Sequence, residues 1–261
     1  MSQRTFETIL LETDETGIAT LKINRPDKLN ALNSRVLSEL ETAMKEVNSD
    51  EAIRVLLITG AGEKAFVAGA DIKELNTLNK ETGEMLASRG QKIFDAVENS
   101  KKPIIAIVNG YALGGGAELA MACHIRVATE NALIGLPEVS LGLIPGYGGT
   151  QRLPALVGKS KAMEMILTGK PIKADAALQS GLVSAVLSIE EALDYAKKLA
   201  GAIMKNGPLA LSAAIEAVNA SGRANGFARE AVLFSELCET EDFTEGTSAF
   251  LEKRNAQFKG K

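Results

Sequence analysis

The sequence predicts an α/β fold for most of its 261 residues, followed by a helical C-terminal part. Three observations support this prediction. Short apolar runs alternate with segments of helical periodicity as far as about residue 187, which is typical of strand–helix–strand units. Two of the runs, 55–58 and 104–108, are continuously apolar, as expected of strands buried on both faces. From about Ile189 onward the pattern is only helical.

Each predicted element follows from a local pattern. Alternating apolar and polar residues predict the first strand, which Pro26 ends because proline cannot continue a ladder. One-sided apolar spacing predicts the first two helices, and Ser34 is available to cap the first. Gly181 is typical of a helix end before a strand. In chain order, the expected elements are strand 19–23, helix 34–47, strand 55–58, helix 85–97, strand 104–108, helix 117–122 and strand 182–187.

The C-terminal part is expected to contain helices separated by turn residues such as Gly207-Pro208 and Ser221-Gly222. A group of helices with several apolar faces cannot cover itself completely. We therefore expect it to pack against the first part of the chain or against another subunit. The helices are predicted at 189–205, 208–220, 227–240 and 243–256.

Composition limits the classes of function. Lys plus Arg total 29 and Asp plus Glu 33, and this net charge of −4 argues against a dedicated nucleic-acid surface. The two cysteines, Cys123 and Cys238, match no metal spacing and are expected to be reduced thiols in a cytoplasmic protein. Residues 1–15 are acidic and lack the apolar segment of a signal peptide, and no apolar run is long enough to cross a bilayer. We expect a soluble protein without a metal, nucleic-acid or membrane partner.

Three consecutive glycines, Gly114–Gly116, stand directly before the helix predicted at 117–122. Glycine lets the backbone adopt unusual conformations and lets a ligand approach closely. The start of a helix also offers free N–H groups and the positive end of a dipole, where an oxyanion is stabilised. Glu118 lies in the first turn of this helix, and the dipole alone would explain an isolated glutamate there.

A second glycine-rich region follows, from Pro137-Glu138 to Gly148-Gly149. By itself, Glu138 would be an ordinary solvated loop residue. With Glu118 it forms a pair of carboxylates beside two flexible loops. Such pairs suit acid/base chemistry because one carboxyl group can be ionised while the other holds a proton. The residues alone predict a site with two carboxylates and an oxyanion hole.

Residues 60–65 imitate a dinucleotide-binding fingerprint, G-x-G-x-x-A after an apolar strand. The fingerprint should open a helix at once, but the segment 66–69 is a poor helix start. The motif also lies later in the chain than is typical. The sequence therefore argues against an NAD site.

Five blocks of the sequence carry a resemblance to a known family: 24–26 with 29–32, 68–73, 109–121, 137–152 and 250–254. With these blocks the sequence resembles, over essentially its whole length, the crotonase (enoyl-CoA hydratase/isomerase) family. Any one matching block is weak, but five in the family's order are highly specific. The resemblance implies an α/β fold, a crotonase-like spiral of ββα units with a C-terminal α-helical trimerisation region.

The family's architecture implies a division of the chain and an assembly. Residues 1–200 would form the spiral core with the active site. Residues 201–261 would form the helical region, which serves oligomerisation and closes the CoA site. The assembly would be a homo-trimer or, as trimers pair, a homo-hexamer.

The resemblance implies an enoyl-CoA hydratase, which adds water syn to a 2-trans-enoyl-CoA. Backbone N–H groups of Ala70 and Gly115 would form the oxyanion hole for the thioester carbonyl, worth roughly 3 kcal/mol each in the transition state. Glu118 would activate water for attack at C3, and Glu138 would deliver a proton to C2 on the same face. Double-bond isomerases of the family commonly keep only the later glutamate, so the presence of both favours hydration. No cofactor is implied, because CoA is part of the substrate.

A CoA site is also implied. The segment from Ala68 to Lys73 would run beside the pantetheine and adenine, with Lys73 near the nucleotide. Lys28 would help to bind phosphates, although a solvated surface charge explains it equally well. Phe250 and Lys253 would close over CoA, from the same or a neighbouring subunit. The predicted contacts are Lys28, Ala68, Ala70, Asp71, Ile72, Lys73, Gly115, Phe250 and Lys253.

Two positions depart from the family's pattern. Hydratases of this type commonly carry Asp where this chain has His124, its one histidine. We expect His124 to be a structural replacement, not a catalytic base. Leu136 replaces a polar or aromatic residue that is frequent in relatives. Both departures bear on substrate preference more than on reaction type, and the sequence does not determine acyl chain length or pathway.

Other activities stand as alternatives. Within the family they are an enoyl-CoA isomerase, or a thioester hydrolase or decarboxylase that uses the same oxyanion hole. A serine peptidase of related fold would need a Ser–His–Asp set, but the chain has one histidine and no recognisable nucleophile motif. A non-catalytic CoA or RNA binder is the last alternative, and the slightly acidic balance argues against RNA.

Overall fold

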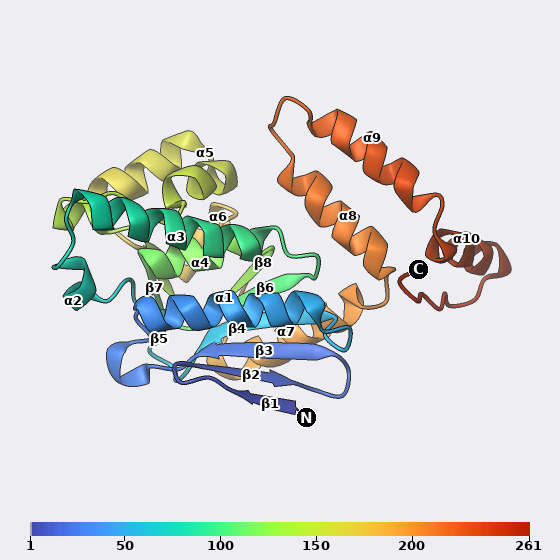
Figure 1. Ribbon diagram of the computed structural model, residues 1–261, viewed down its shortest axis with the longest axis horizontal. Coiled ribbons are helices and arrows are strands. Elements are labelled where there is room, and N and C mark those ends of the chain that lie inside the picture. Colours follow the sequence, from blue (N-terminus) through green and yellow to red (C-terminus); the bar gives the residue numbers. More distant parts are fainter. Residues whose placement is uncertain (1) are drawn as a thin grey trace.

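The computed structural model describes residues 2–261, with side chains described from residue 6 onward. It contains two β-sheets surrounded by helices (Figure 1). The larger sheet is parallel from its third strand onward. Its strands, in spatial order, are β1 (Ser2–Thr5), β2 (Ile9–Thr13), β3 (Ile18–Ile23), β4 (Val55–Gly60), β6 (Ile104–Val108), β8 (Ile125–Thr129) and β11 (Ala185–Leu187).

The smaller sheet consists of short strands. In spatial order they are β10 (Ile172–Lys173), β9 (Leu133–Gly135), β7 (Tyr111–Leu113) and β5 (Ala65–Val67). β5, β7 and β9 run parallel, so their carboxyl ends lie at one edge. Each follows a strand of the larger sheet and precedes a helix, and the chain thus repeats a strand–strand–helix unit.

Helices cover both faces of the larger sheet. Leu56 and Ile58 of β4 belong to the core that contains α1 (Ser34–Ser49) and α3 (Lys80–Glu98), whereas Val55 and Leu57 pack with α7 (Ile189–Ile203). The predicted burial of this strand on both faces is confirmed. The other helices are η1 (Pro26–Lys28), α2 (Ile72–Leu75), α4 (Gly115–Ala122), η2 (Glu138–Leu141), α5 (Gly149–Thr168), α6 (Ala174–Gln179), α8 (Pro208–Asn219), α9 (Gly226–Leu237) and α10 (Glu241–Glu252).

The prediction of a strand at 182–187 is wrong for residues 182–184. β11 begins at Ala185, because the Leu182 N–H donates to the carbonyl oxygen of Ala177 at 2.9 Å and so closes the end of α6. The sequence also gave no prediction for β1, β2, β8 or the smaller sheet. Strands of two or three residues are too short to show a periodicity.

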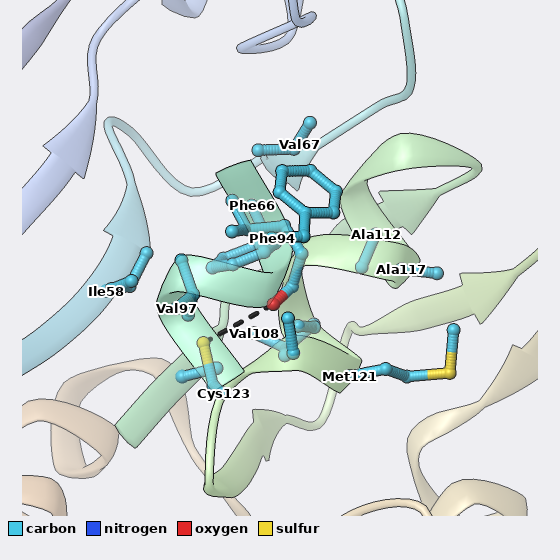
Figure 2. Packing of buried hydrophobic residues seen from close by; sticks show 14 of the residues in the cluster. Ile58, Phe66, Val67, Phe94, Val97, Val108, Ala112, Ala117, Met121 and Cys123 are labelled. Atoms are coloured by element: carbon cyan, nitrogen blue, oxygen red, sulfur yellow. Dashed lines mark hydrogen bonds between the residues drawn. The ribbon is translucent and has the colours of Figure 1, made fainter. Parts of the chain in front are cut away.

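Helix α4, which begins within the glycine cluster at Gly115, is buried along its whole length. Figure 2 shows Phe66, Phe94 and other apolar side chains packed around it. A Cβ atom on Gly116 would lie 2.0 Å from the carbonyl oxygen of Val67, so only glycine lets α4 contact β5 this closely. At the end of α4, burial raises the pKa of the Cys123 thiol to about 12, and the thiol is therefore unreactive.

The C-terminal helices α8, α9 and α10 lie to one side of the rest of the chain, drawn in orange to red in Figure 1. α8 has no buried residue, and Leu233 is the buried residue of α9. Large apolar side chains are therefore exposed: Val218, Phe227, Phe234, Phe250 and Leu251. Within the part of the chain that the structure describes, no helix has the length and apolar character needed to cross a membrane.

Candidate functional site

A cavity of about 460 Å³ lies where the carboxyl ends of β5, β7 and β9 meet. Ligands commonly bind at this edge of a parallel sheet. The four residues predicted to be catalytic, Ala70, Gly115, Glu118 and Glu138, all line the cavity. Much of the remaining wall is apolar and includes Leu75, Leu78, Leu86, Ala87, Leu141, Leu143, Ile144, Pro145 and Tyr147.

The backbone around Ala70 is fixed by pairing with Leu32. The Leu32 N–H donates to the Gly69 carbonyl at 2.8 Å, and the Leu32 carbonyl accepts from the Asp71 N–H at 2.7 Å. The Gly69–Ala70 peptide is trans, so the Ala70 N–H points away from Leu32. It has no acceptor among the described residues. The buried Asn30 donates to the carbonyl oxygens of Ala61 and Ala65, at the beginning of β5.

The second amide without an acceptor in the described part of the chain belongs to Gly115, the first residue of α4, where a helix leaves its N–H groups unpaired. Gly114 precedes it with φ +50°, a conformation that favours glycine. A Cβ atom on Gly114 would lie 2.8 Å from Glu138 Oε1 and 3.9 Å from the Cα of Gly69. The segments after β5, β7 and β9 therefore meet at Gly114.

Glu118 is 1% exposed, and its Oε1 accepts hydrogen bonds from the N–H groups of Tyr147 at 2.8 Å and Gly149 at 2.7 Å. Its Oε2 has no partner among the described residues. Burial, together with the negative charge of Glu138, raises the pKa of Glu118 to about 7, although the N–H donors and Arg152 oppose the shift. A carboxyl group with this pKa exchanges protons readily near neutral pH.

Glu138 lies at the start of η2, beside Gly114. Its Oε2 is buried and has no hydrogen-bond partner among the described residues. Burial raises the pKa of this carboxyl group. Since an unpartnered buried oxygen is costly when it carries charge, the protonated form of Glu138 is favoured.

The cavity thus combines two carboxyl groups with raised pKa values and two backbone N–H groups that have no acceptor among the described residues. Such N–H groups stabilise negative charge that develops on a carbonyl oxygen. The paired carboxyl groups are able to move protons at the carbon atoms next to that carbonyl. This arrangement suits reactions that pass through an enolate.

The other predicted contacts differ in their surroundings. Ala68 and Ile72 line the cavity. Asp71 caps α2 by accepting from the Lys73 N–H, and it also pairs with Arg25 at 3.1 Å. Burial opposes ionisation of Asp71, but these hydrogen bonds prevail and lower its pKa. Its carboxylate therefore holds the backbone beside Ala70.

The predicted charged and aromatic contacts are exposed. Lys73 is exposed, and the Lys28 ammonium lies 3.9 Å from Asp27 in solvent. Phe250, 84% exposed, and Lys253 lie at the end of α10, on the other side of Figure 1 from α2. Neither lines the cavity. One chain alone does not bring them to the site.

His124 has structural contacts. Its Nδ1 accepts from the Ile104 N–H at 2.9 Å, and its Nε2 donates to the Glu98 carbonyl at 3.0 Å. Burial lowers its pKa, so the ring is neutral and joins the end of α3 to β6. Leu136 is buried in the core. Neither His124 nor Leu136 lines the cavity.

The groups that hold Glu118 were not predicted from the sequence. These are the N–H groups of Tyr147 and Gly149, which belong to the second glycine-rich region. Any residue except proline can supply a backbone N–H donor, so residue type does not reveal which ones hold Glu118. The glycines of this region were the one signal in the sequence that pointed to these donors. Arg152, which contacts the same turn, was also given no role.

Comparison with known proteins relates the chain to enzymes of acyl-CoA metabolism. A family model described as enoyl-CoA hydratase/isomerase matches residues 13–261. A crotonyl-CoA hydratase of Syntrophomonas wolfei is 46% identical over 256 residues, which is 97% of this chain and 98% of the relative. A short-chain-enoyl-CoA hydratase of Clostridium acetobutylicum is 44% identical over 252 residues, 95% and 96% of the two chains. The crystal structure of an enoyl-CoA hydratase from Bacillus anthracis is 38% identical with a TM-score of 0.92, and the match covers 98% of this chain and 100% of that one.

Proposed function

The chain belongs to the enoyl-CoA hydratase/isomerase family, and from this premise we propose how its cavity performs the reaction. The fold is the crotonase fold, and the enzyme is an enoyl-CoA hydratase that converts a 2-trans-enoyl-CoA to a 3-hydroxyacyl-CoA. One observation supports the proposed mechanism above all. The carboxyl groups of the buried Glu118 and the half-buried Glu138 line the same cavity as the amides of Ala70 and Gly115, which have no acceptor among the described residues.

The thioester carbonyl oxygen would accept hydrogen bonds from the Ala70 and Gly115 N–H groups. Both amides are held by the surrounding backbone before substrate binds, so little reorganisation is needed. Their hydrogen bonds strengthen as the oxygen gains negative charge, and each contributes roughly 3 kcal/mol to the transition state.

Glu118 would take a proton from water while the water oxygen forms its bond to C3. The electrons of the double bond move toward the thioester oxygen and give an enolate. Glu138 would then give its proton to C2, which restores the carbonyl. Afterwards Glu118 holds a proton and Glu138 has lost one, and exchange with solvent resets the pair. No cofactor takes part in this scheme, because CoA is part of the substrate.

The substrates we propose are short enoyl chains, with crotonyl-CoA as the reference. The names of the two curated relatives support this size class. The apolar wall of the cavity suits an alkyl chain, and a hydrogen bond of 2.9 Å from Gln91 Nε2 to the Gly146 carbonyl ties α3 to the loop at the wall. Lys73 and Lys28 are the cations proposed for the CoA phosphates.

We also propose that the active assembly is a homo-trimer or homo-hexamer. The exposed apolar side chains of α8–α10 support this, because a surface of this kind is usually covered by another subunit. In such an assembly Phe250 and Lys253 of one copy would close the CoA site of a neighbour.

A hydration assay tests the function and the mechanism together. Purified protein is mixed with 2-trans-enoyl-CoA thioesters of increasing chain length, and loss of the conjugated thioester absorbance is followed. Glu118→Gln and Glu138→Gln should each lower turnover about 100-fold or more while substrate binding survives. Absence of turnover on every chain length would contradict hydration, and turnover of 3-enoyl-CoA instead would identify an isomerase.

A further inference from the structure

Arg152 is a buried arginine that the mechanism above does not use. It lies in the first turns of α5, is 8% exposed and does not line the cavity. All three guanidinium nitrogens are hydrogen-bonded. Nη1 donates to the Tyr147 carbonyl at 2.9 Å, and Nη2 donates to Asp95 at 2.6 Å. Nε and Nη2 both donate to Glu98 Oε2, at 3.0 Å and 2.8 Å.

The Tyr147 contact links Arg152 to the active site. Tyr147 accepts from Arg152 through its carbonyl and donates to Glu118 through its N–H. Gly149, two residues later, gives Glu118 its second hydrogen bond. The turn 147–149 therefore lies between the guanidinium group and the proposed catalytic carboxylate.

The turn needs such external support because two of its three residues are glycines. Gly148 has φ +104°, and a Cβ atom there would lie 2.3 Å from Arg152 Nη1. The ring of Tyr147 packs edge-on against Phe94 of α3, with ring centroids 5.5 Å apart. The acidic partners of Arg152 also lie on α3, so this helix is the anchor for the turn.

We propose that Arg152 is a positioning residue for hydration, which fixes the turn 147–149 so that its two N–H groups hold Glu118 with Oε2 directed to the substrate. This inference rests on the role proposed above for Glu118. The buried positive charge has a second effect, because it opposes the rise in the pKa of Glu118 that burial causes. Loss of Arg152 should therefore change both the geometry and the titration of the base.

The test compares Arg152→Met with Leu153→Ala. Leu153 is the next residue of α5 and is also buried, but its side chain is apolar and has no polar contact with the turn. For Arg152→Met we expect kcat on crotonyl-CoA to fall about 10-fold to 100-fold, because small displacements of a catalytic group cost this much. KM should change little, and the acid limb of the pH profile should move to higher pH. Leu153→Ala should lower thermal stability without moving that limb.

Glu98→Gln is a second variant, which weakens the anchor and leaves the arginine in place. It should lower kcat by a smaller factor, and it replaces Arg152→Met if that variant does not fold. Its acid limb should move to lower pH, because loss of the negative charge of Glu98 favours ionisation of Glu118. The inference would be overturned if whichever of these two variants folds kept the wild-type kcat and the wild-type acid limb of the pH profile. It would also be overturned if its changes equalled those of Leu153→Ala. If the wild type hydrates and Glu118→Gln does not, such a result rejects the role of Arg152 alone. A wild type without hydratase activity rejects the proposed function itself.

Discussion

At the scale of single residues, Glu118 is buried and Glu138 is half-buried with a buried Oε2, and their carboxyl groups have different partners. Two N–H groups bind Glu118 Oε1, whereas Glu138 Oε2 has no partner among the described residues. Hydrogen bonds from N–H groups favour a charged carboxylate, and isolation favours a neutral one. The geometry therefore agrees with an ionised Glu118 as base and a protonated Glu138 as acid.

The pH dependence of hydration should reflect this pair. The pKa of Glu118 is raised from its ordinary value of 4.5 to about 7, so the base is protonated in more acidic solution. We expect kcat/KM to fall as the pH drops below about 7. Because the two groups titrate together, the apparent pKa belongs to the pair. A profile that stays flat down to pH 4.5 would argue against Glu118 as the base.

Glu118→Gln should also stabilise the fold in alkaline solution. A folded pKa above the unfolded value means that ionisation is unfavourable in the native state, so stability is lost as the pH rises through about 7. Glutamine keeps an oxygen acceptor for the two N–H groups and carries no charge. The variant should exceed the wild type by up to about 3 kcal/mol above pH 7. Thermal unfolding followed across the pH range measures this, and a difference that does not change with pH contradicts it.

At the scale of elements, the site is assembled from the ends of three short strands. β5, β7 and β9 lie side by side in parallel, and the residues that follow them line one cavity. The sequence predicted the long buried strands β4 and β6, whose apolar runs are continuous. It did not predict the short ones, although the predicted glycine clusters lie at their ends. Long-range pairing, not local propensity, decides such strands.

Gly114→Ala should remove most of the activity. The residue has φ +50°, and its Cβ atom would collide with Glu138 Oε1 at 2.8 Å. Displacement of Glu138 and of the adjacent Gly115 amide should lower turnover by at least about 100-fold. The matched control is Gly201→Ala in α7, where a Cβ atom meets nothing within 4 Å.

The control variant should keep full hydratase activity. It should also gain up to about 1 kcal/mol of stability, because alanine is the better helix former. Initial rates and melting temperatures of the two variants test the pair of expectations. Normal turnover of Gly114→Ala would mean that the site tolerates a shift of Glu138.

At the scale of the whole molecule, the last three helices lie beside the rest of the chain and do not pack closely on it. The buried face of α7 ends at Ala200, next to the boundary predicted between residues 200 and 201. Phe227 is 92% exposed, which is unusual for an aromatic side chain in a protein that acts alone. The division into a core and an assembly region remains our prediction.

Subunit exchange tests whether a neighbour completes the CoA site. Lys253→Ala should raise the KM for crotonyl-CoA and leave kcat nearly unchanged. The Lys253→Ala chains are then co-assembled with chains of the inactive Glu118→Gln variant. In the mixed assembly, a Lys253→Ala chain supplies an intact Glu118, and a neighbouring Glu118→Gln chain would supply Lys253 to the same site. The KM of the mixture should then return toward the wild-type value. If mixing has no effect, Lys253 does not act across a subunit boundary.

The sequence by itself determined the α/β class, the buried strands, the C-terminal helices and the two glutamates beside glycine clusters. These features depend on local pattern and residue type, which a chain carries before it folds. The tertiary structure decided which backbone N–H groups stay free, which ones hold Glu118, and that Glu138 Oε2 is isolated. Such properties depend on contacts between segments that are distant in sequence, such as the pairing of Leu32 with Ala70. They also involve backbone N–H and C=O groups, which nearly every residue type carries alike. Residue type therefore could not reveal them.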